Sequence, residues 1–163
     1  MKKYTLVKSD SITVGNVTLY RIKALRSFGD VYAGDLGGYV QSEYNLSHNE
    51  NAWVSGDARV YGNAWVFENA QVYGDAQVYG NAQVYGNAQV YGDARVCGNV
   101  WVFGDAQVYG YALVYENAWV YWNARVYGDA RVCGDARVYG NARRQAKLGI
   151  IACDNQLDKM GMS

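Results

Sequence analysis

Residues that could perform catalysis are few in this chain of 163 residues, which contains one His and three Cys. His48 is the single imidazole that could act as a general base. No Cys-x-x-Cys spacing is present, which disfavours a zinc site and a disulfide-stapled scaffold. We therefore predict a protein that is not an enzyme and has no cofactor or metal. In this interpretation His48 is a structural or solvent-facing residue.

The abundant side chains are aromatic, with 16 Tyr, 5 Trp and 3 Phe beside 19 Gly and no Pro. They recur because residues 51–146 repeat the pattern Asn/Asp-Ala-x-Val-Tyr-Gly 16 times without insertion or deletion. Within Ala-x-Val-Tyr the faces alternate, so Ala and Val point to one side and x and Tyr to the other. Gly followed by Asn or Asp adopts positive φ easily and turns a corner. The repeat predicts short parallel strands stacked into a coil around Val and Ala.

This repeat resembles the left-handed β-helix of the bacterial hexapeptide-repeat superfamily, and residues 28–47 resemble the lead-in of phage and prophage hexapeptide-repeat proteins. The resemblance implies an all-β fold, a single-stranded left-handed parallel β-helix of about five coils with three walls of six residues each. It also implies a phage or prophage origin. Acyltransferases of this superfamily use a His base and a loop that breaks the repeat, and this chain has no such loop. It also places Tyr where the family prefers a small or acidic residue.

The predicted organisation has three segments. Residues 1–50 form an N-terminal cap and irregular lead-in coils, with a hairpin that turns at Gly15-Asn16 between residues 11–14 and 17–24. Residues 51–146 form the β-helix, and residues 147–163 form a short C-terminal cap or tail.

Because each coil has 18 residues, every third unit stacks on the same wall, at about 4.8 Å per coil. Trp53 is expected to be exposed on the first wall. The third wall collects most of the remaining Trp and Phe, and its predicted interaction surface consists of Trp65, Phe67, Tyr85, Trp101, Phe103, Trp119, Tyr121 and Tyr139. Eight outward aromatic residues exceed the apolar patch that a soluble monomer normally exposes. We interpret them as the interface of a homo-oligomer, a dimer or trimer. Stabilisation of neighbouring coils is the alternative, and we favour it for Tyr on the other two walls.

The formal net charge is zero, but the charges are segregated along the chain. Residues 1–26 contain six basic and one acidic residue, residues 27–124 two and ten, and residues 125–163 seven and four. A basic collar is predicted around the last coil, formed by Arg125, Arg131, Arg137, Arg143 and Arg144. The collar could bind phosphate or an acidic partner. Alternatively, it blocks the open end of the stack against fibre growth.

These observations favour a non-catalytic structural or binding protein that oligomerises through the third wall and binds a host protein. The alternatives are a carbohydrate-binding β-helix module and a degenerate acyltransferase-like protein. No apolar run approaches the roughly 18 residues of a membrane span, and the first residues reach Lys8 and Asp10 before a secretion signal could form. We expect a cytoplasmic protein, in the host cytoplasm if phage-encoded, without a membrane partner. We expect no nucleic-acid partner, since the zero net charge gives no argument for one.

Overall fold

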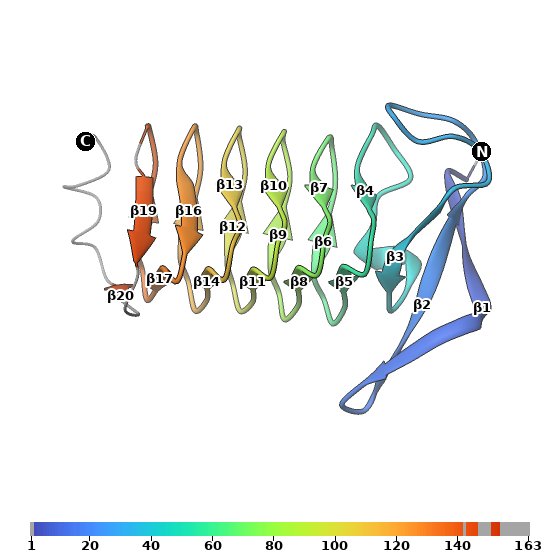
Figure 1. The fold of residues 1–163 in the computed structure, drawn as a ribbon, viewed down its shortest axis with the longest axis horizontal. Coiled ribbons are helices and arrows are strands. Elements are labelled where there is room, and N and C mark those ends of the chain that lie inside the picture. The colour runs from blue at the N-terminus through green and yellow to red at the C-terminus, as the bar shows by residue number, and fades with distance from the viewer. Residues whose placement is uncertain (1, 142, 147–150, 154–163) are drawn as a thin grey trace.

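Three β-sheets form the walls of a solenoid in the computed structural model, which describes residues 2–141, 143–146 and 151–153, with the side chains of residues 2–141 (Figure 1). Residues 18 apart pair in register, as Val72, Val90 and Val108 do on one wall. The predicted all-β solenoid with three walls and 18-residue coils is confirmed. Its left-handed sense stays a prediction. Within the described residues, no helix is long and apolar enough to cross a bilayer.

Each wall is a stack of very short strands. The first wall holds β4 (Trp53–Val54), β7 (Gln71–Val72), β10 (Gln89–Val90), β13 (Gln107–Val108), β16 (Arg125–Gly128) and β19 (Arg143–Ala146). The second wall holds β3 (Leu36–Val40), β5 (Arg59–Val60), β8 (Gln77–Val78), β11 (Arg95–Val96), β14 (Leu113–Val114), β17 (Arg131–Cys133) and β20 (Ile151–Cys153). The third wall holds β6 (Trp65–Val66), β9 (Gln83–Val84), β12 (Trp101–Val102), β15 (Trp119–Val120) and β18 (Arg137–Val138).

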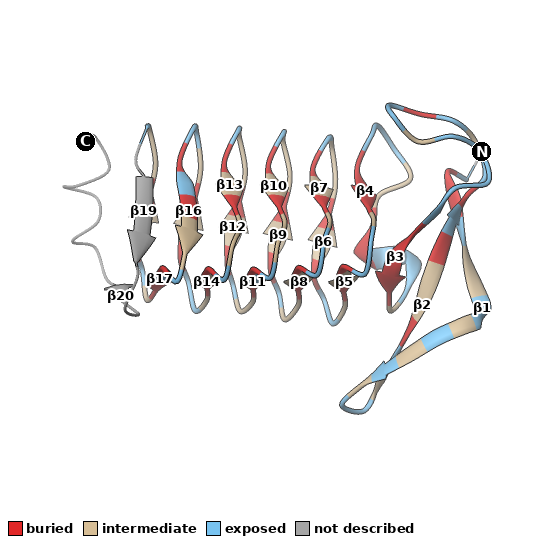
Figure 2. Cartoon of the chain, viewed as in Figure 1, coloured by how far each residue is buried: buried red, intermediate tan, exposed pale blue. Residues whose placement is uncertain are grey.

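The interior is a column of Val and Ala side chains. Figure 2 colours the chain by burial and shows buried positions recurring in every coil. Every repeat valine from Val54 to Val138 has 0% exposed surface. Val100 takes the place of a repeat alanine and is equally buried. Each buried Val contributes roughly 1.5–3 kcal/mol of burial free energy. A two-residue strand is therefore stabilised by its place in the stack and not by its own length.

Glycine is the residue that most corners use, because the backbone there has a positive φ and the coils approach one another closely. Gly86 has a φ of 68°, and a Cβ there would lie 2.8 Å from the backbone nitrogen of Gly104 in the next coil. Glu68 occupies the same kind of corner at a φ of 57°. Its Oε2 accepts a hydrogen bond of 2.9 Å from the Gly86 N–H, which offsets part of the cost of its conformation.

The N-terminal hairpin extends the second wall and projects from the end of the solenoid (Figure 1). Its strands are β1 (Tyr4–Val14) and β2 (Val17–Ala24), and Val14 pairs with Val17 across the predicted Gly15-Asn16 turn. The strand β3 pairs antiparallel with β2 and parallel with β5, where Val40 lies opposite Val60. Coil-like pairing thus begins before Asn51.

The prediction that Trp53 is exposed on the first wall is wrong, since only 4% of its surface is accessible. Its indole packs edge-on against Phe28, with 5.2 Å between the ring centroids, and lies 6.3 Å from Tyr4. These two rings belong to the N-terminal segment, which folds over the first coil and covers the wall there.

The bonding state of the cysteines also differs in part from the prediction that the chain has no disulfide scaffold. Cys97 is a free thiol on the second wall, two coils from Cys133 and therefore too far from it for a disulfide. Cys133 is disulfide-bonded, and its backbone in β17 pairs with that of Cys153 in β20. One cross-link is therefore present in a chain that does not resemble a disulfide scaffold.

Candidate functional site

The third wall brings all eight predicted aromatic residues onto one face, in two parallel columns. The column that follows the valines is a continuous stack, with 4.7 Å between the ring centroids of Phe67 and Tyr85 and 5.0 Å between those of Tyr85 and Phe103. It continues through Tyr121 to Tyr139, at 5.0 and 5.4 Å. The interplanar angles along this column are 16° or less, so the rings lie nearly parallel. The coil repeat alone imposes this spacing, because it matches the distance between neighbouring strands.

The second column contains the tryptophans at the x positions. Trp101 stacks on Trp119 with 4.7 Å between ring centroids, and Trp65 stacks on Phe67 at 3.9 Å. Gln83 separates the two groups because it pairs with both Trp65 and Trp101. All eight side chains are half-buried, which means that stacking covers one part of each ring and leaves another part accessible.

Trp122 belongs to this surface but was missed by pattern reasoning. It replaces a corner glycine, adopts a φ of 57° and is 56% exposed. Its ring meets Tyr121 and Tyr139 edge-on, at 5.4 and 5.5 Å. The sequence could have indicated this role, because Trp122 stands where most units have Gly. A bulky residue at positive φ costs conformational energy, so its presence points to a function or a contact that offsets this cost.

Replacing Trp122 by Gly is therefore expected to stabilise the fold. Glycine adopts the left-handed conformation without strain. The substitution should therefore raise the free energy of unfolding by about 1 kcal/mol and the melting temperature by about 2–4 °C. Thermal unfolding followed by circular dichroism measures this. The control Gly110→Ala should lower the melting temperature, because its Cβ would lie 2.9 Å from the Gly128 nitrogen. A lower melting temperature for Trp122→Gly would mean that its ring contacts outweigh the backbone cost.

The predicted basic collar is divided among the walls. Arg125 lies on the first wall, Arg131 on the second and Arg137 on the third, one on each side of the same coil. Arg137 is engaged, with its guanidinium carbon 4.1 Å from the Trp119 ring centroid and Nη1 donating to the Asp135 carbonyl at 2.9 Å. The backbones of Arg143 and Arg144 lie in β19, and their side chains fall outside the described residues.

Burial governs the ionisation of the tyrosines in these columns. It raises the pKa of Tyr85, and the nearby Glu68 carboxylate raises it further. On the second wall, burial is also the main cause that raises the pKa of Tyr79 to about 12. These phenols are neutral at physiological pH, and each can donate a hydrogen bond.

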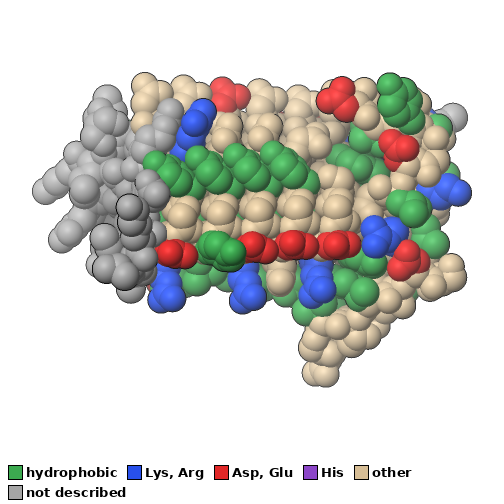
Figure 3. All heavy atoms as spheres, in the orientation of Figure 1, with side chains coloured by type: hydrophobic (Ala, Val, Ile, Leu, Met, Phe, Trp, Pro, Cys, Tyr) green, Lys and Arg blue, Asp and Glu red, His purple; other side chains and the backbone are tan. Residues whose placement is uncertain are grey.

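On the first wall, the hydroxyls of Tyr73 and Tyr91 donate hydrogen bonds to glutamines of the next coil. Tyr73, Tyr91 and Tyr109 stack at 4.8 and 4.9 Å, and the row continues to Tyr127. The Tyr73 hydroxyl donates to Gln89 at 3.1 Å. Figure 3 shows a hydrophobic row of this kind running along the coils. Such contacts link adjacent coils, as we predict for this wall.

His48 is held in the N-terminal cap. Its Nδ1 accepts a hydrogen bond of 3.1 Å from the backbone N–H of Lys3, and its Nε2 lies 2.8 Å from a carboxylate oxygen of Glu43. The ring also stacks on Tyr4 with 4.2 Å between centroids. Both ring nitrogens therefore have partners within the N-terminal cap. Among the described residues, no group of three or more His, Cys, Asp or Glu side chains could hold a metal ion.

Comparison with known families agrees with this architecture. The model of the YdcK beta solenoid repeat matches residues 52–68, 70–86, 76–92, 88–104 and 130–145. No curated protein matches the chain. The matched stretches and the three stacked walls together make this chain a β-solenoid repeat protein.

Proposed function

We propose that this chain is a non-catalytic binding protein, and that two copies associate through the aromatic third wall. The observation that carries the proposal is the concentration of half-buried aromatic rings in two straight columns on one wall, joined at the edge by the exposed Trp122. Aromatic side chains are enriched at the centres of protein interfaces because they bury a large area with little loss of side-chain entropy.

The geometry of the wall suits a two-fold interface. Its strands are straight, regularly spaced and only two residues long, so the wall is flat and can face a second copy of itself. Five strands span about 19 Å along the axis. Such a wall offers roughly several hundred Å² per copy, which is near the lower end for a stable complex. We therefore expect a dimer that dissociates on dilution.

Absence of catalysis is also part of this proposal, in contrast to the alternative of a degenerate acyltransferase of the hexapeptide-repeat superfamily. It is supported by the engagement of both His48 nitrogens and by 16 uninterrupted repeat units, which leave no inserted loop to build a cleft. A phage or prophage origin and a host protein partner belong to the proposal as expectations from the family resemblance.

The test replaces Trp65, Trp101 and Trp119 together by Gln, a residue that five other repeat units carry at this position. Sedimentation equilibrium over a range of concentrations should show a dimer for the unchanged protein and a monomer for the triple variant. The matched control replaces Tyr73, Tyr91 and Tyr109 by Gln on the first wall and should remain dimeric. Circular dichroism verifies that both variants are folded. An unchanged mass for the tryptophan variant would refute the interface.

A further inference from the structure

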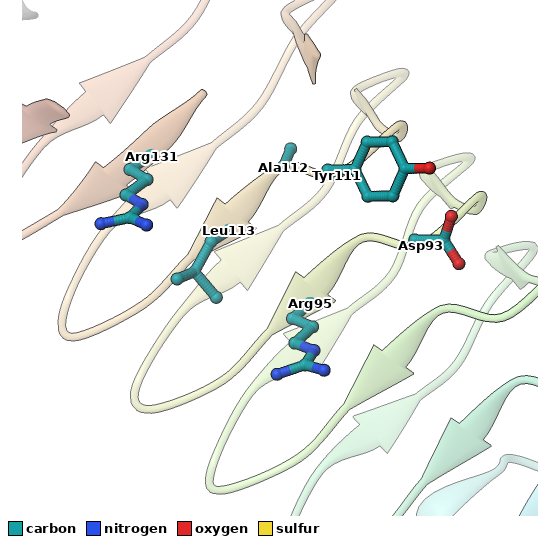
Figure 4. Close-up of a pocket in the computed structure, with 6 residues that line it drawn as sticks. All are labelled: Asp93, Arg95, Tyr111, Ala112, Leu113 and Arg131. Carbon is teal, nitrogen blue, oxygen red and sulfur yellow. The ribbon is translucent and has the colours of Figure 1, made fainter. Parts of the chain in front are cut away.

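A depression of about 400 Å³ lies on the second wall, away from the aromatic surface (Figure 4). It is lined by Asp93, Arg95, Tyr111, Ala112, Leu113 and Arg131. These residues come from three consecutive coils, since Leu113 pairs in register with Arg95 on one side and Arg131 on the other. Leu113 thus forms an apolar floor between Arg95 and Arg131, whose strands lie two coil spacings apart, about 9.6 Å along the wall.

The unit of residues 111–116 departs from the repeat where this depression forms. Tyr111 is the only residue other than Asn or Asp at the first position of the 16 units, and Leu113 is the only aliphatic residue at x. Tyr111 is 69% exposed, although Asn or Asp serves every other corner of this kind. The coil does not need an exposed ring here, so both departures point to a contact with something outside the chain.

The charges around the depression are available for a ligand. Among the residues that the structure describes, neither Arg95 nor Arg131 forms an ion pair, and both are exposed. Arg137, by comparison, is bound to Trp119 and to backbone carbonyls. Two unpaired guanidinium groups beside an apolar floor favour an anion that also has an apolar face.

The carboxylate of Asp93 restricts which anions could bind in the depression. Its carboxylate lies next to Tyr111 at the corner, in the same column of the coil (Figure 4). A carboxylate accepts hydrogen bonds from hydroxyl groups but repels a second negative charge. Asp57 and Asp75 precede it in the same column, which would repel a continuous polyanion such as a nucleic acid. A suitable ligand therefore combines separated carboxylates with hydroxyl groups.

The geometry points to an acidic saccharide as the ligand of this depression, with carboxylates on alternate sugars. One carboxylate accepts hydrogen bonds from Arg95 and the next from Arg131. The sugar between them packs its apolar face on Leu113 and Tyr111, and a ring hydroxyl donates to Asp93. This site lies on a different wall from the proposed dimer interface, so each can fail without affecting the other.

Isothermal titration calorimetry with a hyaluronan hexasaccharide tests this inference, because its carboxylates lie on alternate sugars. Neutral chitohexaose and inorganic phosphate serve as comparison ligands. The unchanged protein should bind hyaluronan and bind neither comparison ligand measurably. Arg95→Gln and Arg131→Gln should each weaken binding at least about tenfold. Tyr111→Asn should weaken it about five- to tenfold. All three introduce residues that other repeat units use at the same positions.

Arg59→Gln is the matched control, because Arg59 lies on the same wall, two coils before Arg95 and outside the depression. It should bind hyaluronan as the unchanged protein does. An equal loss for Arg59→Gln would show diffuse attraction to positive charge and would overturn the site. Equal binding of chitohexaose, tighter binding of phosphate, or no hyaluronan binding at millimolar concentration would overturn it as well.

Discussion

A carboxylate placed in the middle of the solenoid, by the substitution Val90→Asp, is expected to prevent folding of the central coils. Val90 has 0% exposed surface and pairs in register with Val72 and Val108. An aspartate there would face a column of Val and Ala without a hydrogen-bonding partner. The expected loss in the free energy of unfolding is about 4 kcal/mol or more.

Thermal and urea unfolding followed by circular dichroism measure that loss. The matched control is Gln77→Asp, which lies beside the buried Val78 on the outward side of β8. It should change stability by no more than about 0.5 kcal/mol. A melting temperature of Val90→Asp equal to that of the unchanged protein would contradict the assignment of this face to the interior.

The substitution Asn45→Ala is expected to have the second largest effect and to act at one end of the molecule. Asn45 has no exposed surface and satisfies all of its hydrogen-bonding groups. Its Nδ2 donates to the carbonyls of Gly62 and Ala64, at 3.1 and 2.8 Å. Its Oδ1 accepts from the backbone N–H groups of Gln41 and Ser42, at 3.1 and 3.0 Å.

The two carbonyls explain why this side chain matters. In the regular coils, the equivalent carbonyls of Gly80 and Ala82 accept from the backbone N–H groups of Asn63 and Trp65. In the lead-in coil, residues 43–45 form a 3-10 turn, and the amide of Asn45 replaces the backbone donors. Removing it leaves buried polar groups unpaired, at an expected cost of about 3 kcal/mol or more.

Hydrogen exchange followed by mass spectrometry should locate this loss. Peptides covering residues 36–66 should lose protection, while peptides covering residues 87–126 keep theirs, because each coil contacts only its neighbours. The control Asn63→Ala removes an exposed corner amide that bonds to Asn81 at 3.2 Å, and it should leave the exchange pattern unchanged. Uniform loss of protection along the solenoid would contradict a local role for Asn45.

Substitutions at the repeat positions could be interpreted from the sequence because the period of six assigns each side chain a direction, and the three walls implied by the family resemblance assign it a wall. The eight aromatic residues from Trp65 to Tyr139 lie together on the third wall, as the spacing predicts. The hairpin turn at Gly15-Asn16 was equally predictable, since this dipeptide favours the required positive φ.

Other features depend on segments that the repeat does not describe. Trp53 has the sequence context of an outward residue, but Phe28 from the N-terminal segment covers it. Asn45 sits in a lead-in coil whose Val40 lies opposite Val60, 20 residues later instead of 18. No local sequence pattern predicts this longer coil, because it results from packing between segments that are distant in the chain.

The sequence by itself determined the stacked repeat and its inward and outward faces, because side chains alternate strictly within each unit of six residues. The wall of each repeat residue followed once the resemblance to the hexapeptide-repeat superfamily implied three walls per coil. Only the tertiary structure decided which outward residues reach solvent, how Trp122 joins the aromatic wall and that Arg95 and Arg131, on either side of Leu113, form no ion pair with the described residues. These properties arise from contacts between coils and from the cap that covers the first one. They follow from the three-dimensional neighbours of a residue, which the period alone does not specify.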